Sequence, residues 1–461
     1  MGNLKINLIY TFGSQSIQLL RSIIVSLLVP KIMGVQEFGF WQLFIFYTQY
    51  GGFIHLGLID GILQRNGGIL YDKLNFKYIG YQLGVLSIWM AIAIIPFCVL
   101  GITNKDANRS IVILLSCLFV IINILYTFFL YVLQAVNRFK VASYGKTIIS
   151  SLFILSVLLM ICYRVSDYRP YIYTYIVSHL IGLLYYAYRC KEIVLNVTFK
   201  SSHIYMYNTI SDIKVGFVLL ISNIMGMLIL GFGRFMVDMQ WGITTFATVS
   251  FALMFVNFFL MFINQASQVL FPDLRHRTSA EISVFYQKIR GKLSIMFPIA
   301  LLLYVPICEL VGLWLPKYLK SMEYLVFLLP LCVFDSRMNL LCNTIYKVFN
   351  KIKLLLLCNT ISLVVSVVLI TLSIYVFQSV RLVVLSMLVA IGLRVIIAEK
   401  LLSRFFSVQT NNRRIVLELL LVGSFVITNL MFDSWKSWTC SVIVSIVYIL
   451  ILKKINSYEN S

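Results

Sequence analysis

The sequence predicts an all-α membrane protein that crosses the bilayer about 14 times. Hydrophobic residues make up 60% of the 461-residue chain and charged residues only 12%, whereas soluble domains contain about 45–50% apolar and about 25% charged residues. Apolar stretches long enough to cross a bilayer occupy nearly all of the chain, and no segment between them is large enough to fold alone. The predicted spans are 9–33, 38–60, 78–100, 111–136, 147–163, 171–187, 213–234, 243–270, 292–315, 323–346, 354–377, 382–402, 415–432 and 438–452.

The first span is predicted to be a membrane helix rather than a cleaved signal peptide. It is too long for a signal peptide and it contains Arg21. It is followed by Val29-Pro30-Lys31, where small residues would mark a cleavage site. We therefore expect this span to open the series of membrane helices.

An internal repeat predicts that spans 1–6 and 7–12 form two lobes of six helices each. The segment Lys31–Gly39 matches Arg234–Gly242 in a basic residue, a methionine and an aromatic-glycine pair, and Asn137–Ile148 matches Asn350–Ile361 at identical internal spacing. The copies lie about 200 residues apart, which equals six spans, so they should lie on the same side of the membrane. We expect a parallel repeat around an axis along the membrane normal.

The same repeat sets the expected domain boundaries. Residues 1–205 should form the first lobe with the start of the connecting loop, and residues 206–405 should form the second lobe. Residues 406–461 should add spans 13 and 14 and a tail. The loop around 188–212 joins the lobes and is the expected hinge.

The distribution of basic residues predicts the orientation. The net charge is +21, and most of the 38 Lys and Arg residues lie at the N-terminus and in every second loop after it. Positively charged loops stay on the cytoplasmic side. Both termini should therefore be cytoplasmic.

Motifs for catalysis, metal binding and nucleotide binding are missing from the sequence. The nine cysteines form no CxxC pair, the four histidines form no HExxH motif, and Ser143–Thr147 lacks the first glycine of a phosphate-binding loop. No loop outside the membrane is long enough to carry a catalytic centre. We expect no enzyme activity, no cofactor, no metal site and no nucleic-acid partner.

Polar residues recur on one face of two spans, which predicts an aqueous cavity. In span 1, Ser14, Gln18 and Arg21 recur at helical spacing, and in span 8 Asn257 and Asn264 do the same. Neutral polar residues in membrane helices also serve as hydrogen bonds between helices, which is the competing interpretation.

Charged residues within spans are the strongest candidates for function, because a charge at the bilayer centre costs about 2.5–3.5 kcal/mol or more. Arg21 has no acid three or four residues away in the sequence. Asp335 is close enough in sequence to neutralise Arg337, and Glu399 is a candidate partner for Arg394. Arg234 has Asp238 four residues later, and His55 and Asp60, which we expect in the outer half of span 2, are candidates for ion coupling.

Several short segments resemble the Wzx-type O-antigen flippases of the multidrug/oligosaccharidyl-lipid/polysaccharide exporter superfamily. They are Pro30–Leu43, Gly57–Gly61, Phe271–Leu274, Leu315–Tyr318, Ser321–Leu325 and Asn350-Lys351. The likeness extends over the whole chain in length, number of spans and repeat, but it does not define a substrate.

The resemblance implies two six-helix lobes around a central cavity that opens to either side of the bacterial inner membrane in turn. The implied cargo is an undecaprenyl-diphosphate-linked oligosaccharide, moved from the cytoplasmic to the periplasmic leaflet. Implied partners are this lipid, the surrounding membrane lipids and other polysaccharide-assembly proteins. By position in the spans, the resemblance carries a cavity role over to Arg21 and to Arg234, Arg337 and Arg394.

Three other functions stay open at this point, and one of them, a solute permease, is disfavoured only by the resemblance. A multidrug exporter of the same superfamily would have the same topology but an acidic, aromatic cavity for organic cations, whereas the candidate site charges within these spans lean basic. A membrane-embedded polysaccharide polymerase or ligase would carry a large outer loop with catalytic residues, and every predicted outer loop here is short.

Overall fold

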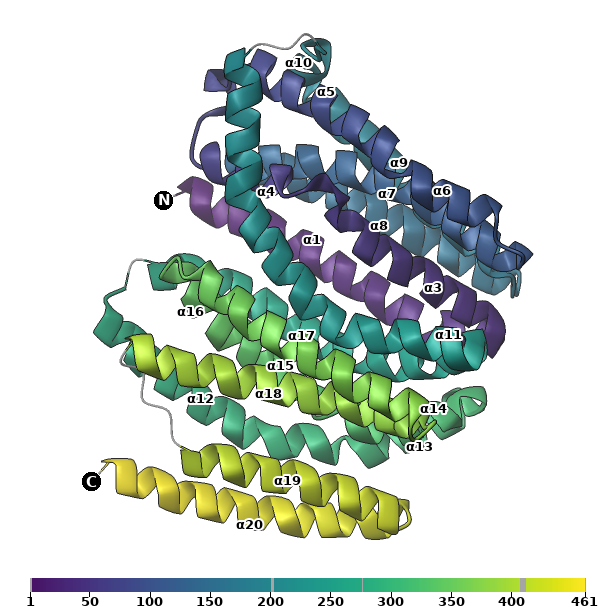
Figure 1. Cartoon of the computed structure of the whole chain (residues 1–461), viewed down its shortest axis with the longest axis vertical. Helices are drawn as coiled ribbons and strands as arrows, with labels where there is room; N and C mark the ends of the chain where they lie inside the picture. Colours follow the sequence, from purple (N-terminus) through teal and green to yellow (C-terminus); the bar gives the residue numbers. More distant parts are fainter. Residues whose placement is uncertain (1, 200–202, 276, 407–411, 461) are drawn as a thin grey trace. The chain divides into compact units, whose positions relative to one another are not determined.

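The computed structural model describes residues 2–199, 203–275, 277–406 and 412–460, and these residues form helices without any strand (Figure 1). Within these ranges, ten helices are long and apolar enough to cross a membrane, or eleven if a bent pair counts as one span. The expectation of an all-α, multi-pass membrane protein is confirmed.

The number of spans is lower than predicted for identifiable reasons. Helix α11 (His203–Arg275) contains two predicted spans, joined at Gly242, whose φ of 78° and ψ of −178° interrupt the helix. Helix α3 (Val35–Gly51) has only 17 residues because span 2 is broken in the middle. Helix α9 (Tyr168–Arg189) is less apolar than the others, since seven of its 22 residues are tyrosine.

The chain divides into two compact units, Met1–Ile224 and Met225–Ser461. The boundary lies inside α11, whereas the sequence placed it at 205/206. The parallel repeat that was expected to relate the two lobes stays a prediction.

Unit 1 contains the first six predicted spans and the beginning of α11. Helix α1 ends at Leu27 and is followed by the short helix α2, which has Pro30 in its first turn. Span 2 is broken by the left-handed residues Leu56 (φ 53°) and Gly57 (φ 84°). The remaining helices are α1 (Gly2–Leu27), α2 (Val29–Ile32), α4 (Leu58–Arg65), α5 (Phe76–Ala93), α6 (Ile95–Ile102), α7 (Ala107–Ala135), α8 (Phe139–Cys162) and α10 (Lys191–Leu195).

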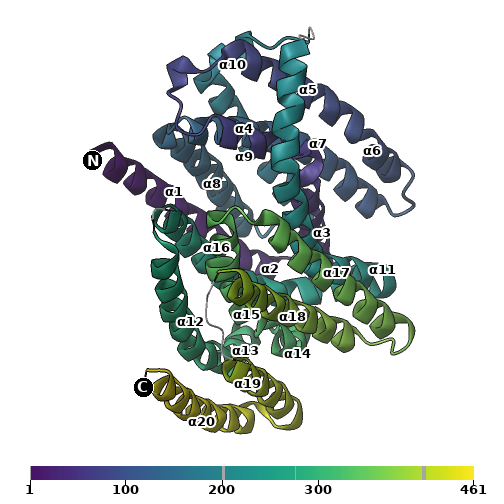
Figure 2. The same ribbon diagram turned by 60° about the vertical axis from the view of Figure 1, so that its left-hand side comes forward.

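Unit 2 contains the rest of α11 and all later helices. They are α12 (Ser279–Leu302), α13 (Tyr304–Trp314), α14 (Leu319–Leu328), α15 (Leu331–Arg337), α16 (Asn343–Val348), α17 (Ile352–Tyr375), α18 (Val380–Phe406), α19 (Asn412–Met431) and α20 (Ser434–Asn460). Helices α19 and α20 run side by side as an antiparallel hairpin (Figure 2). The helices from Pro316 to Leu328 and from Leu331 to Val348 are bent by 45° relative to each other.

Side-chain caps fix where several helices start at the membrane surface. Asp106 accepts hydrogen bonds from the backbone N–H groups of Asn108 and Arg109, and Asp167 accepts one from Arg169. Thr278 and Glu281 form a reciprocal capping box, and the hydrogen bonds from Thr278 hold the pKa of Glu281 below its usual value. These caps satisfy N–H groups that a helix leaves without partners.

The start of α11 belongs to unit 1 because glycines allow its backbone to touch α4. A Cβ atom on Gly216 would lie 2.0 Å from the carbonyl oxygen of Gly57, and one on Gly61 would lie 2.2 Å from that of Asp212. Gly57 and Gly61 have the spacing of a GxxxG motif, which lets membrane helices approach closely.

Asp212 reinforces this contact with three polar partners. Arg65 of α4 forms an ion pair with Asp212 at 2.5 Å, and Tyr78 and Gln82 of α5 each donate a hydrogen bond of 2.8 Å to its other carboxylate oxygen. The early part of α11 is therefore fixed to α4 and α5, which explains why the unit boundary lies beyond the predicted one.

We predict that Gly216→Ala destabilises the protein, although alanine is the better helix former by about 1 kcal/mol. The added methyl group would overlap the backbone of α4 and force the helices apart. The thermal unfolding midpoint in detergent should fall. The matched control is Gly291→Ala in α12, where a Cβ meets no atom within 4 Å; equal midpoints for both variants would contradict the close contact.

Candidate functional site

Arg21 lies in α1 with its guanidinium carbon 6.0 Å from the centre of the Tyr175 ring of α9. Its side chain is half-buried, and among the described residues no acid pairs with it. A contact with an aromatic ring contributes about 0.5–2 kcal/mol, which is less than the cost of placing a charge deep in a membrane, about 2.5–3.5 kcal/mol or more. Arg21 is therefore a cation with unused capacity for an anion.

Aromatic rings surround Tyr175, the residue of α9 that Arg21 contacts. The Tyr175 ring is 4.4 Å from the His179 ring and 5.1 Å from Phe119 of α7. Trp41 of α3 meets Tyr175 edge-on at 5.7 Å. This packing fixes Tyr175, and so fixes the surface against which Arg21 lies.

Ser14 and Gln18, predicted on the same face of α1, use their donors within their own helix. Ser14 Oγ donates to the carbonyl oxygen of Thr11 at 2.9 Å, and Gln18 Nε2 donates to that of Ser14 at 3.2 Å. Neither bond joins α1 to another helix. The roles of both residues in substrate binding stay predictions.

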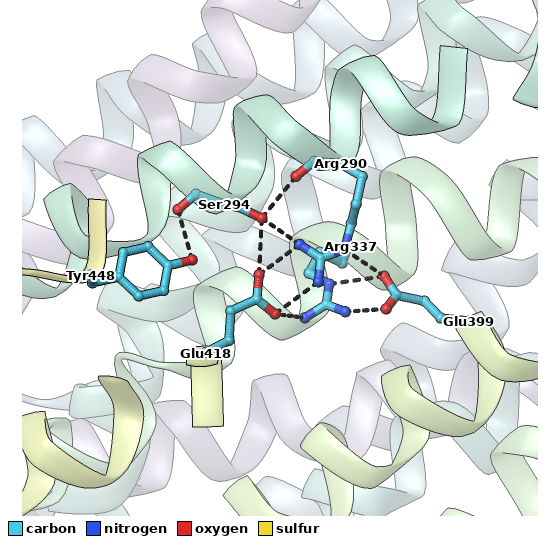
Figure 3. Close-up of polar contacts among 6 residues, drawn as sticks. All are labelled: Arg290, Ser294, Arg337, Glu399, Glu418 and Tyr448. Carbon is cyan, nitrogen blue, oxygen red and sulfur yellow. Dashed lines mark hydrogen bonds and ion pairs between the residues drawn. The ribbon is translucent and has the colours of Figure 1, made fainter. Parts of the chain in front are cut away.

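A closed network of four charges lies inside unit 2 (Figure 3). Arg290 of α12 contacts both oxygens of Glu418 of α19, at 2.6 and 2.8 Å, and Glu399 of α18 at 3.1 Å. Arg337 of α15 donates to Glu399 through Nε at 3.0 Å and through Nη2, and to Glu418 through Nη1 at 2.7 Å. The network is neutral and is contributed by four helices.

The network is sealed from its surroundings. The Arg290 side chain is 6% exposed, and those of Arg337, Glu399 and Glu418 are each 1% exposed. Ser294 donates to Glu418 at 3.0 Å, and Tyr448 of α20 donates to the Ser294 carbonyl oxygen at 3.2 Å. The hairpin of α19 and α20 is thereby bound to the rest of unit 2 by charged groups.

This geometry corrects the predicted pairing of Arg337. Asp335 does not neutralise it, because residues two apart point about 160° away from each other around a helix. Glu399 and Glu418 take its Nε, Nη1 and Nη2 donors instead. The arrangement favours a structural role for Arg337 over the predicted contact with substrate.

Arg394 likewise has a different partner from the one predicted. Glu399, five residues later, points about 140° away around the helix. Arg394 Nη1 instead lies 3.7 Å from Asp335 Oδ1, and its Nε donates to Asn359 Oδ1 of α17 at 2.7 Å. Arg394 and Asp335 therefore form a second, separate ion pair in unit 2.

Arg234 lies at the corner of α11 that Gly242 creates. Its Nη2 donates to Ser250 Oγ at 3.0 Å, and its guanidinium lies 5.1 Å from the centre of the Phe246 ring. These contacts connect the helix before the corner to the helix after it. Asn257, further along, is exposed, and the side chain of Asn264 lies outside the described residues.

His55 and Asp60 flank the break in span 2. His55 Nδ1 accepts a hydrogen bond of 3.1 Å from the backbone N–H of Gly57, and Asp60 is half-buried. After span 2, the backbone N–H of Gly68 donates a hydrogen bond to the carbonyl oxygen of Ala135, at the end of α7. The loop that follows α7 is predicted to be cytoplasmic. Both residues follow the midpoint of span 2, and their position in the outer half of the membrane and their role in ion coupling stay predictions.

Sequence reasoning did not single out Arg290 and Glu418 as site residues, and it assigned Glu399 to Arg394 rather than to this network. The signal was available, because Glu399 and Glu418 are acids within predicted spans 12 and 13. Acids in apolar spans require a cationic partner or water, and the basic residues that were already singled out are such partners.

Comparison with known proteins gives a match in fold. No protein-family model matches the chain, and no curated protein is similar to it in sequence. The solved structure of the lipid II flippase MurJ in an inward closed conformation has 12% identity and a TM-score of 0.59, with 98% of this chain and 99% of that chain covered. The chain has the same fold as this flippase.

Two further structures agree. An inward-facing multidrug resistance MATE family transporter of the MOP superfamily has 13% identity and a TM-score of 0.63, and the match covers 86% of this chain and 94% of that chain. A MOP superfamily transporter from Pyrococcus furiosus has 14% identity and a TM-score of 0.51, with 88% and 95% covered. All three are transporters or flippases by their descriptions.

We predict that Glu418→Gln destabilises the protein strongly, because it leaves two buried arginines with one carboxylate. Removing one partner of a buried ion pair costs about 3–5 kcal/mol. The matched control is Glu323→Gln, which breaks an exposed ion pair with Arg381 at 2.7 Å and should cost about 0–1 kcal/mol. Thermal unfolding in detergent measures both; a Glu418→Gln midpoint as high as that of the control would show that the network is dispensable.

Proposed function

We propose that this protein is a flippase that moves an undecaprenyl-diphosphate-linked oligosaccharide from the cytoplasmic to the periplasmic leaflet by alternating access. It would act in the bacterial inner membrane with both termini in the cytoplasm. The observation that carries this proposal is Arg21, a half-buried cation in a membrane helix that no described acid neutralises.

The chemistry of a diphosphate suits Arg21 better than it suits the other candidates. Arg337 and Arg394 are paired with acids, and Arg234 donates to Ser250. Arg21 presents a planar guanidinium fork, which binds phosphate oxygens through two parallel charge-assisted hydrogen bonds. The neighbouring aromatic surface around Tyr175 offers an apolar face beside this charge.

The structural neighbours support the proposal without defining the cargo. One of them is described as a lipid II flippase, and its match extends over 98% of this chain. The inside-negative membrane potential would favour outward movement of an anionic lipid by about 2.3 kcal/mol per charge and 100 mV.

A multidrug exporter is the second candidate, favoured by the similarity to MATE transporters. An organic cation requires an acid that is free to bind it. In unit 2, however, Glu399, Glu418 and Asp335 each have an arginine partner. This balance of charge favours an anionic cargo.

Transport by purified protein in liposomes tests the function directly. We predict that a labelled undecaprenyl-diphosphate oligosaccharide crosses the bilayer with the wild-type protein, and that Arg21→Ala slows it at least about tenfold, because a hydrogen bond to a charged group contributes about 1.5–3 kcal/mol. Arg21→Lys should restore part of the rate, since lysine keeps the charge but not the fork.

The control is Arg381→Ala, which removes an arginine from an exposed ion pair and should leave transport unchanged. Normal transport of the lipid by Arg21→Ala would show that Arg21 has a structural role. Transport of organic cations in place of the lipid would establish the multidrug exporter.

A further inference from the structure

The membrane span built from α14, α15 and α16 is irregular at two points. Pro330, which lacks an N–H group, lies at the 45° bend between α14 and α15. Residues Met338–Cys342 form a turn of π-helix between α15 and α16. Irregular backbone within a membrane span is frequent at functional sites, and Asp335 lies between these two points.

Asp335 differs from the other buried acids of unit 2 in how it is held. Glu399 and Glu418 receive several short bonds from two arginines. Asp335 has only Arg394 at 3.7 Å, and no described residue donates a hydrogen bond to its carboxylate. When this carboxylate takes up a proton, it gives up no hydrogen bond from a described residue and only the ion pair with Arg394 is lost.

The exposure of the side chains also distinguishes Asp335 from Glu399 and Glu418. The side chains of Asp335 and Arg394 are 11% and 10% exposed, against 1% for Glu399 and Glu418. Asp335 is therefore less completely enclosed than Glu399 and Glu418, which can be reached only if the network of Arg290, Arg337, Glu399 and Glu418 comes apart.

Arg394 is held in place independently of Asp335. Its Nε donates a hydrogen bond of 2.7 Å to Asn359 Oδ1. Its Nη2 packs against Gly226 of α11, where an added Cβ atom would lie only 2.7 Å from it. When Asp335 becomes neutral, the guanidinium stays between α17 and α11 and its positive charge is no longer balanced. Protonation thus changes the local charge from zero to positive.

We propose that Asp335 is the carboxylate that binds and releases the proton that drives the transport cycle. The proton adds to a carboxylate oxygen and leaves from it, and no other bond forms or breaks. Sodium is a poorer occupant, because the guanidinium 3.7 Å away repels a metal ion and holds the place where further oxygen ligands would be needed. The proton site rests on the proposed function only for the identity of the cargo.

The groups around the pair set its electrostatics. Arg290 of α12 and Glu399 of α18 are both used within the network. The other titratable groups that interact with the pair are Cys332, which faces Asp335, and Cys342 and Cys358, which face Arg394. Arg394 is therefore the cation whose balance depends on Asp335.

Infrared difference spectroscopy of the purified protein between acidic and alkaline pH tests the site without any cargo. We expect a carbonyl band of a protonated carboxylic acid in the wild type, its loss in Asp335→Asn and a shifted band in Asp335→Glu. The matched control is Glu323→Gln, which removes an exposed acid paired with Arg381 and should keep the wild-type band. An unchanged spectrum in a folded Asp335→Asn or Asp335→Glu variant would overturn the proposal.

Two further measurements distinguish proton binding at Asp335 from sodium binding, and test the proton site independently of the proposed cargo. If sodium at constant pH changes the spectrum in a manner that depends on Asp335, the occupant is sodium and the proposal fails. In liposomes, Asp335→Asn should lose the stimulation of lipid transport by a pH gradient. An Asp335 band in a protein that transports no lipid-linked oligosaccharide would leave the proton site standing and refute the cargo.

Discussion

The neutral network of Arg290, Arg337, Glu399 and Glu418 is the interaction on which the rest of unit 2 depends. It brings together α12, α15, α18 and α19 inside a protein whose surroundings cannot solvate a charge. Two arginines and two glutamates satisfy one another, so none can be removed alone without leaving a buried charge. The network therefore fixes both the helix arrangement and the attachment of the C-terminal hairpin.

The network also decides which charges are available for function. Because it uses two arginines and two glutamates completely, it removes them from the candidates for binding cargo or ions. Among the charges that the network leaves out are an arginine without a described acid in unit 1, Arg21, and a loosely paired acid in unit 2, Asp335. Cargo binding and energy coupling would then be located in different units, and a transport cycle would link them.

The sequence was sufficient for the membrane class and for the approximate positions of the spans, because apolar length is a local property. It was not sufficient for charge pairing. Arg337 and Arg394 were both recognised as costly, yet their partners were sought nearby in the chain, where helix geometry points them away. Glu399 and Glu418 lie 62 and 81 residues from Arg337 in the sequence, and such contacts depend on tertiary packing.

The boundary between the two units also depends on tertiary contacts that the sequence does not reveal. The glycines of α4 form a recognisable GxxxG pair, but only the structure shows that Gly216 and Asp212 of α11 are their partners. A pattern on one helix does not name the helix that it packs against. The boundary between the compact units lies inside α11, at Ile224 and Met225, and the hinge expected in the loop around 188–212 stays a prediction.

The most direct test of this account is an experimental structure of the protein with an undecaprenyl-diphosphate oligosaccharide bound. The account predicts that phosphate oxygens lie within hydrogen-bond distance of the Arg21 guanidinium, at about 2.7–2.9 Å, and that the four-charge network is unchanged. A diphosphate bound between Arg290 and Arg337, with Glu418 displaced, would contradict it.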